Sequence, residues 1–241
     1  MLVFPPLIIV VGHYGVGKTN LALNLVREQR LACQSRADVI RQTLVDLDIV
    51  NPYYRASEYT EELKTAGIDL LGPVYGTSTL DTPSLMPGID SAIENSKITH
   101  PVLIDVGGDP DGARALARFS DQINNQSDRM VIYVVNNARP EVAKPEDAVT
   151  TLREIEEISG VKATHIAGNT HLKDQTTSEY IVASISYVKA VALAAKLPVA
   201  FITAPRSFFD EVEALKPSQT ETTVLPVDIF IGNLWEELKL L

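Results

Sequence analysis

One stretch near the start of the chain combines residue types that together can bind phosphate. Residues 12–19 read GHYGVGKT and fit the pattern G-x-x-x-x-G-K-[ST]; we call them the phosphate loop. Glycines in such a loop allow close backbone approach, so that N–H groups and the positive end of the next helix surround a phosphate. Lys18 can reach the β- and γ-phosphate oxygens, and the Thr19 hydroxyl can ligate Mg²⁺.

The surroundings of the phosphate loop fit this chemistry. Residues 7–11 form an apolar run typical of a buried strand, and residues 20–30 have helical spacing. The alternative is a chance glycine turn before a helix, and average residue usage gives the four fixed positions in roughly one such chain in a hundred. We therefore expect a nucleotide phosphate site. The residues expected to contact the nucleotide are Gly12, His13, Tyr14, Gly15, Val16, Gly17, Lys18, Thr19 and Asn20.

Two further apolar runs end in carboxylates. Residues 45–52 read VDLDIVNP and residues 103–110 read LIDVGGDP. In a phosphate-cleaving site, one carboxylate at a strand end can hold Mg²⁺ and another can orient the attacking water. Gly107 and Gly108 would let backbone N–H groups approach the γ-phosphate and respond to its loss. The alternative is that these acids only cap the next helix or turn, but a phosphate loop upstream favours the functional interpretation.

Short apolar runs alternate with helical patterns along the chain, with no repeat and no linker that would divide it. This alternation predicts one α/β domain over residues 1–241, in which right-handed β-α-β units form a mostly parallel sheet with helices on both faces. Ligands of such sheets bind beyond the carboxyl ends of the strands. The phosphate loop and the two acidic strand ends would therefore meet at one edge.

The apolar runs and helical patterns also predict where each element lies. The predicted strands are residues 7–11, 43–48, 68–71, 101–106, 129–135, 163–167, 199–203 and 224–231. The predicted helices are residues 20–30, 55–66, 113–126, 146–159, 178–196 and 234–241, with an irregular connection over residues 72–88. The helix over 146–159 is expected to bury Leu152, Ile155 and Ile158, and the helix over 178–196 is expected to bury Ile181, Ile185, Val188 and Ala192.

The composition bounds the possible partners. The formal charge is 21 − 31 = −10, with no lysine- or arginine-rich block, which argues against sequence-independent nucleic-acid binding and against docking on anionic lipid. The single cysteine, Cys33, excludes an internal disulfide and is expected to be a buried free thiol. The first apolar run is far too short to span a bilayer. We therefore expect a cytoplasmic protein with no nucleic-acid or membrane partner.

Three segments together carry a family resemblance: VVGHYGVGKT (residues 10–19), LVDLDIVNPYYR (residues 44–55) and LIDVGGD (residues 103–109). The chain resembles the MinD/ParA/CobQ-type P-loop ATPases, the deviant-Walker branch of the SIMIBI class, over nearly its whole length. It is most similar to uncharacterised bacterial ATP-binding proteins that carry a D-L-D-x-x-N-P-Y-x-R segment.

The resemblance assigns roles to the motif residues. It implies Mg-ATP as the bound nucleotide, with Lys18 on the phosphates and Thr19 on the metal. Asp48 matches the first switch aspartate, which helps to position the attacking water, and Asp105 matches the Walker B aspartate. Lys18 and Asp48 are therefore the expected catalytic residues. The expected metal ligands are Thr19, Asp48 and Asp105.

One position departs from the family pattern. Family members commonly carry a second, signature lysine directly after the first glycine, and it reaches the other subunit's nucleotide in an ATP-bound dimer. His13 occupies this position here, and histidine is shorter and only partly charged at neutral pH. The resemblance implies a homodimer, and we expect its association to depend on ATP less than in members with the lysine. Arg55 and Arg139 are candidates for the missing charge, and either could equally be an ordinary surface or structural arginine.

Base identity rests on the loops after two late strands. Guanine recognition in related folds commonly uses Asn-Lys-x-Asp, and neither residues 136–139 (NNAR) nor residues 169–172 (NTHL) fit it. The resemblance implies that Asn169 contacts adenine and that a second wall lies near Pro205 and Arg206. An amide both donates and accepts, which suits the edge of adenine. The alternative is that Asn169 is only a turn residue. These observations favour ATP over GTP.

The sequence therefore predicts a Mg-ATP-binding protein that hydrolyses ATP slowly and acts as a nucleotide switch, on an unknown protein client or in the maturation of a cofactor or metalloenzyme. Two alternatives stay open. A metabolic ligase resembling dethiobiotin synthetase or the cobyrinate amidation enzymes would use phosphate to activate a carboxylate, and those enzymes also lack the signature lysine. A nucleotide-gated binding module would bind ATP with negligible turnover.

Overall fold

The computed structural model describes residues 4–34, 41–48, 60–74, 84–85, 87–172, 175–217 and 221–230. Arg55 and the first part of the helix predicted over 55–66 lie outside the described residues. The helix predicted over 234–241 also lies outside them.

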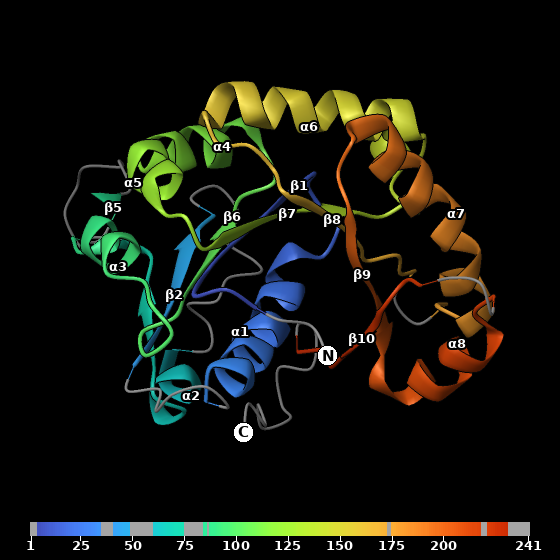
Figure 1. The fold of residues 1–241 in the computed structure, drawn as a ribbon, viewed down its shortest axis with the longest axis horizontal. Coiled ribbons are helices and arrows are strands. Elements are labelled where there is room, and N and C mark those ends of the chain that lie inside the picture. Colours follow the sequence, from blue (N-terminus) through green and yellow to red (C-terminus); the bar gives the residue numbers. More distant parts are fainter. Residues whose placement is uncertain are drawn as a thin grey trace.

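The described residues form an eight-stranded sheet in which all neighbouring strands are parallel. The strands are β1 (Leu7–Gly12), β2 (Gln42–Leu47), β3 (Ile68–Leu71), β6 (Val102–Val106), β7 (Arg129–Val135), β8 (His165–Gly168), β9 (Val199–Pro205) and β10 (Val224–Val227). Their order is β10-β9-β8-β7-β1-β6-β2-β3, so β1, which leads into the phosphate loop, lies inside the sheet (Figure 1). The predicted parallel α/β fold is confirmed.

The central strands are apolar on both faces because helices cover both faces of the sheet. Every residue of β1 and of β6 is buried. Parallel strands in this position read as continuous apolar runs rather than as alternating patterns. Burying an aliphatic side chain such as Ile8 or Leu103 contributes about 1.5–3 kcal/mol. These buried strands therefore hold in place the loops at their carboxyl ends, which are the phosphate loop after β1 and the loop after β6.

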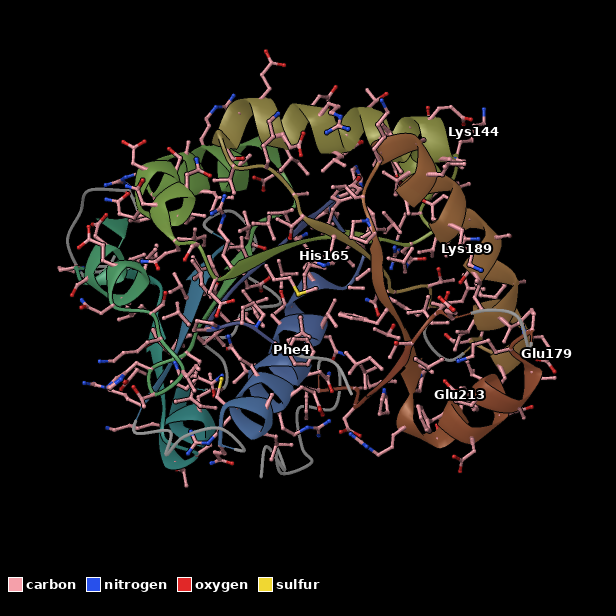
Figure 2. All side chains as sticks on the ribbon, in the orientation of Figure 1. Phe4, Lys144, His165, Glu179, Lys189 and Glu213 are labelled. Atoms are coloured by element: carbon pink, nitrogen blue, oxygen red, sulfur yellow. The ribbon has the colours of Figure 1, made fainter. Side chains whose placement is uncertain are left out.

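The helices form two layers around the sheet. Figure 1 shows α1 (Lys18–Gln34) on one side, and α4 (Pro110–Ala117), α5 (Ser120–Asn125) and α6 (Pro145–Ser159) along the other. The remaining helices are α2 (Thr60–Thr65), α3 (Ile89–Glu94), α7 (Ser178–Ala195) and α8 (Phe209–Leu215), with single 3₁₀ turns η2 (Pro140–Val142) and η3 (Arg206–Phe208). α7 packs against α6, α8, β8 and β9. Charged side chains such as Lys144, Glu179 and Lys189 lie on the outside (Figure 2).

α7 is an apolar helix whose inner face matches the prediction. It starts after Thr177, whose side chain accepts a hydrogen bond from Tyr180 N at 3.3 Å, and it ends at Lys196 with φ 59°. By length and composition α7 could cross a membrane, but half of it is buried inside the fold, and the core helix of a soluble protein passes the same test. The four residues expected to face inward are all buried: Ile181, Ile185, Val188 and Ala192.

The single helix predicted over residues 113–126 is wrong, because two helices lie there. α4 starts earlier because Asp109 accepts a hydrogen bond from Gly112 N at 2.8 Å and because Pro110 suits the first turn of a helix. At Phe119 the backbone leaves the helical region (φ −113°, ψ 10°) and the side chain, 4% exposed, enters the core. Two short helices, α3 and α8, were not predicted either. Nor was the antiparallel pair of β4 (Pro73–Val74) and β5 (Ser84–Leu85).

One residue expected on the buried face of α6 is exposed. Leu152 is buried as predicted, but Ile158 is 36% exposed, so the prediction for Ile158 is wrong. Glu156 is buried instead, because its carboxylate accepts hydrogen bonds from Ala163 N at 3.0 Å and from Arg153 Nη1 at 2.6 Å. A carboxylate with such partners can occupy a buried position. Hydrophobic spacing alone does not reveal this exchange.

β10 is shorter than the strand predicted over residues 224–231. After it, backbone groups bond to side chains of α1 rather than to β9. Asp228 N donates to Asn24 Oδ1 at 2.8 Å, and Phe230 N donates to Asn20 Oδ1 at 2.8 Å. The end of the described chain is therefore tied to the first turns of the helix that follows the phosphate loop.

Candidate nucleotide-binding site

The phosphate loop joins the end of β1 to the first residue of α1. Gly15 and Gly17 have φ angles of 75° and 88°, a region that L side chains rarely adopt. Gly17 also lacks room for a side chain, since a Cβ would lie 2.4 Å from Asn169 Nδ2 and 3.0 Å from His171 Nε2. Conformation and space therefore both require glycine at this point of the loop.

Lys18 is a buried cation at the start of α1. Its Nζ donates a hydrogen bond to His13 O at 3.1 Å, so the side chain folds back over the loop. Burial lowers the pKa of Lys18, and the carboxylates of Asp105, Asp48 and Asp109 oppose that shift. An ammonium group has three donors, and His13 O is the acceptor it has among the described residues. Lys18 is therefore placed to bind an anion over the loop.

Two carboxylates face each other beside Lys18. Asp46 of β2 and Asp105 of β6 are partners in the parallel register, and each is 1% exposed. Asp48 follows at the end of β2, and its N–H donates to Asp46 Oδ1 at 2.9 Å. The structure therefore brings the predicted residues Asp48 and Asp105 together with Lys18, and it adds Asp46 to the group.

Asp105 holds a proton more tightly than an ordinary aspartate. Burial raises its pKa to about 7, and the charges of Asp46 and Asp48 add to that shift, while Lys18 and the Thr19 hydroxyl lower the pKa. Neither carboxylate oxygen makes a hydrogen bond of normal geometry with the described residues. Thr19 thus acts on Asp105 without the alignment of a full hydrogen bond. A buried carboxylate whose oxygens lack hydrogen-bond partners could bind a cation.

Mg²⁺ fits these groups together with phosphate oxygens or water. In the described part of the chain, no three His, Cys, Asp or Glu side chains converge as a set of metal ligands. Proteins usually hold Mg²⁺ by one or two carboxylates plus substrate phosphates, and the ion keeps several waters. Thr19 and Asp105 suit that arrangement, and a cation there would give the buried Asp105 oxygens a partner. Asp48 is the second carboxylate within the same group of charges.

The loop after β6 touches the phosphate loop. A Cβ on Gly108 would lie 2.5 Å from Lys18 Nζ and 2.6 Å from the N and Cα atoms of Tyr14, so only glycine permits this approach. The next residue, Asp109, caps α4 through Gly112 N. The capping interpretation therefore holds for Asp109. For Asp105, whose oxygens make no such bond, it does not.

Asn169 supports the phosphate loop from the side of β8. Its Nδ2 donates to Val16 O at 2.8 Å and approaches Gly17 O at 3.4 Å, and its Oδ1 accepts a hydrogen bond from Thr203 Oγ1 at 2.6 Å. Both ends of the amide are therefore engaged with the protein. The role of Asn169 in contacting adenine stays a prediction, and its position behind the loop is what the structure adds.

Arg206 bonds to a carboxylate rather than to the loop. Its Nε lies 3.1 Å from Asp228 Oδ1 and its Nη2 lies 3.2 Å from Asp228 Oδ2. Partial burial would raise the pKa of Asp228, but hydrogen bonds from Arg206 and Arg27 hold it below its ordinary value. Because Asn20 and Asn24 donate to Asp228 O, this residue links the end of β9 to α1.

Comparison with solved structures identifies the fold. FtsY from Thermotoga maritima is 16% identical, with a TM-score of 0.53, over 85% of this chain and 64% of that chain. FlhF complexed with GMPPNP and Mg²⁺ is 14% identical, with a TM-score of 0.50, over 84% of this chain and 67% of that chain. FtsY from Elizabethkingia anophelis in complex with GDP is 15% identical, with a TM-score of 0.50, over 83% and 57%.

This chain has the P-loop NTPase fold. It spans less than two thirds of the length of either FtsY chain. No family model and no curated protein matches it.

The P-loop NTPase fold brings the predicted residues to one edge of the sheet. Asp48 and Asp105 lie beside Lys18 of the phosphate loop, and Asn169 lies behind that loop. Pro205 ends β9 and Arg206 follows it, on the far side of β8 from β1. Arg206 is not joined to the loop directly but through Asp228 and α1.

Four residues at this edge of the P-loop NTPase fold were not predicted from the sequence: Asp46, His171, Thr203 and Asp228. Asp46 had a local signal, because residues two apart on a strand share a face and Asp46 stands two before Asp48. The other three have no such signal. Their partners are distant in sequence and are known only once the strands are ordered.

Proposed function

We propose that this protein binds Mg-ATP in the phosphate loop, hydrolyses it slowly and uses the bound state as a switch. The observation that carries the proposal is Lys18, a buried cation folded over the loop beside the carboxylates of Asp105 and Asp48. A lysine so placed can exchange a carbonyl acceptor for β- and γ-phosphate oxygens. Burying this charge costs free energy that the neighbouring carboxylates offset only in part, and a bound anion would offset more of it.

Each side chain then has a distinct task. Lys18 and the N–H groups of the loop bind the phosphates and stabilise the charge that develops in the transition state. Thr19 and Asp105 would hold Mg²⁺, which neutralises charge on the phosphate oxygens when bound. Asp48 orients the attacking water, and Asp46 fixes the backbone N–H of Asp48 by a hydrogen bond of 2.9 Å.

The contact of Gly108 with the phosphate loop suggests how the bound state reaches the surface. Gly108 lies against Lys18 and Tyr14, and the next residue caps α4. A γ-phosphate near Lys18 would hold this segment, and loss of that phosphate would release it. Because Asp109 begins α4, such a movement would be passed to that helix. The client would then respond to the position of α4.

ATP is proposed over GTP because the loops after β7 and β8 lack the Asn-Lys-x-Asp pattern of guanine sites. The matched FlhF and Elizabethkingia FtsY structures hold guanine nucleotides. At 14% and 15% identity, however, the similarity supports a shared fold and does not indicate which base this chain binds. Displacement of a fluorescent ATP analogue by unlabelled Mg-ATP and Mg-GTP tests the preference. Displacement by GTP at concentrations equal to or below those of ATP would reverse it.

Phosphate release in single-turnover experiments tests hydrolysis and separates the alternatives. The wild type should release phosphate slowly from Mg-ATP, and Asp48→Ala should bind ATP but release phosphate at least tenfold more slowly (about 1.4 kcal/mol). Asp128→Ala, an exposed aspartate at the opposite end of the sheet, is the control. Equal rates in wild type and Asp48→Ala would show that another residue positions the water.

His13 supports the ligase alternative, because dethiobiotin synthetase and the cobyrinate amidation enzymes also lack a lysine at that position. A ligase would consume ATP much faster when its carboxylic acid substrate is added, whereas a switch would not. Turnover measured with and without a panel of dicarboxylic and amino acids distinguishes the two. Binding without any turnover under all these conditions would favour the nucleotide-gated binding module.

We also propose that the protein works as a cytoplasmic homodimer with a protein client. Tyr14, in the phosphate loop, is 56% exposed and would be accessible to a second subunit. The net charge of −10 gives no support to a nucleic-acid or membrane partner. Light scattering with ADP, with a non-hydrolysable ATP analogue and without nucleotide tests this. A monomer in all three states would contradict it.

A further inference from the structure

The loop after β7 places an arginine against the phosphate loop. β7 is the neighbour of β1 in the sheet, with Val134 opposite Gly12, so residues 136–139 follow at the same edge. Arg139 lies directly on Gly15. A Cβ built on Gly15 would lie 3.4 Å from Arg139 Nε, 3.5 Å from Cζ and 3.7 Å from Cδ. The guanidinium group therefore borders the loop that would receive phosphate.

Arg139 differs from the other half-buried arginines in the parts of the chain that the structure covers. Arg27 pairs with Asp228, and Arg30 and Arg129 donate to backbone carbonyls. Each of these three also has one buried guanidinium nitrogen without a partner, whereas the Arg139 guanidinium makes no hydrogen bond or ion pair at all with the described residues, and its Nε is buried. Leaving a buried charged donor unpaired costs free energy, so such a group normally has a partner when it is in use.

The backbone holds Arg139 in place. Asn136 Oδ1 accepts a hydrogen bond from Ala138 N at 2.9 Å, and Arg139 N donates to Asn136 O at 3.1 Å. On the other side, Val142 N donates to Arg139 O at 3.1 Å. A side chain that starts from so constrained a backbone loses less entropy when it binds a ligand. Its position beside Gly15 is therefore part of the fold.

The position of Lys18 indicates which part of the nucleotide Arg139 would meet. Lys18 Nζ bonds to His13 O, so the group that serves the β- and γ-phosphates lies at the 13–15 end of the loop. Asn169 and His171 lie at Gly17, on the other part of the loop. Arg139 borders Gly15 and therefore stands at the terminal-phosphate end.

We propose that Arg139 binds the terminal phosphate of the nucleoside triphosphate from within the same subunit. A guanidinium group presents five donors in a planar fork that matches phosphate oxygens. It supplies a positive charge beside Gly15 of the phosphate loop. Arg139 would favour a triphosphate over a diphosphate, because only the third phosphate would lie within its reach. This inference rests on the proposed function, and it adds a specificity-determining residue to that site.

Calorimetric titration of the full chain with Mg-ADP and with a non-hydrolysable Mg-ATP analogue tests the inference without relying on turnover. Arg139→Ala should weaken binding of the triphosphate about tenfold or more and binding of ADP less than about threefold. Arg139→Lys, which keeps the charge but loses the fork, should fall between. Arg118→Ala removes an exposed arginine at the end of α4 and should change neither affinity.

The outcomes separate the inference from the proposed function. If Arg139→Ala binds both nucleotides with wild-type affinity, or if its affinity for both falls equally, the proposed role of Arg139 is wrong. Binding of Mg-ATP to the wild type would still support the nucleotide site in that case. A wild type that binds neither nucleotide overturns both. If Arg139→Ala unfolds at a lower temperature than the other variants, Arg139→Lys carries the test, and its unchanged preference for the triphosphate over ADP overturns the inference.

Discussion

Asp46 and Asp105 stand opposite each other on neighbouring strands, each 1% exposed, and the charge of Asp46 helps to raise the pKa of Asp105. Two adjacent buried carboxylates repel each other and are costly unless protonated or matched by cations. Lys18 supplies one positive charge, and Mg²⁺ would supply the next. A divalent cation would therefore offset the repulsion within this pair, although no three ligand side chains converge in the described residues.

The pair predicts how stability depends on pH. In the folded protein the pKa of Asp105 is about 7, above its ordinary value of 3.8. Between these values the folded state binds a proton that the unfolded state has lost, so the contribution of Asp105 to stability is greatest at low pH and is lost as pH rises through about 7.

Asp46→Asn should flatten this profile. The amide removes the charge that raises the pKa of Asp105 but keeps an oxygen to accept the hydrogen bond from Asp48 N. Urea unfolding with chelator, between pH 5 and pH 8, should show a loss of stability smaller than in wild type by about 1–2 kcal/mol. Asp128→Asn, at an exposed site, should follow wild type. Parallel profiles for Asp46→Asn and wild type would remove Asp46 from this account.

Gly108→Ala should separate the loop after β6 from the phosphate loop. Its Cβ would lie 2.6 Å from the backbone of Tyr14, and backbone cannot move aside cheaply. We expect Mg-ATP affinity to fall about tenfold or more, because the new methyl group also lies 2.5 Å from Lys18 Nζ. Gly72→Ala is the matched control, since its Cβ would make an ordinary contact of 3.5 Å with Asp46 Cβ. Equal affinities in the two variants would show that the loop contact is dispensable.

Asn169→Ala should show whether this amide supports the loop or reads the base. Loss of its bonds to Val16 O and Thr203 should lower the free energy of unfolding by about 1–3 kcal/mol. If Asn169 positions the loop, affinity for inorganic tripolyphosphate should fall together with affinity for ATP. If the amide reads adenine alone, tripolyphosphate binding should stay at the wild-type level. Competition titrations with both ligands decide between these roles.

The chemistry of consecutive residues was predictable from the sequence, whereas contacts between distant residues were not. Lys18 and Thr19 follow from a motif eight residues long, and Asp105 follows from a buried strand that ends in acid. The pairing of Asp46 with Asp105 depends on β2 lying next to β6, which no local pattern states. The bond between Asn169 and Val16 spans 153 residues.

The errors in the predicted fold have similar causes. Helical spacing over residues 113–126 is real, but the chain turns at Phe119, whose side chain is buried in the core. Ile158 was placed inside by spacing, whereas hydrogen bonds allow Glu156 to be buried on the same helix. The predicted strand 224–231 stops early because Asn20 and Asn24 bind the following backbone. In each case a tertiary contact overrides a local preference.

The central claim is that Lys18 binds the phosphates of Mg-ATP, and calorimetric titration of wild type and Lys18→Ala with Mg-ATP tests it most directly. Circular dichroism should show that both proteins are folded, and Lys189→Ala, an exposed lysine on α7 (Figure 2), controls for loss of charge. We predict saturable binding to wild type and to Lys189→Ala, and no measurable binding to folded Lys18→Ala. Folded Lys18→Ala that binds Mg-ATP with wild-type affinity would contradict the account.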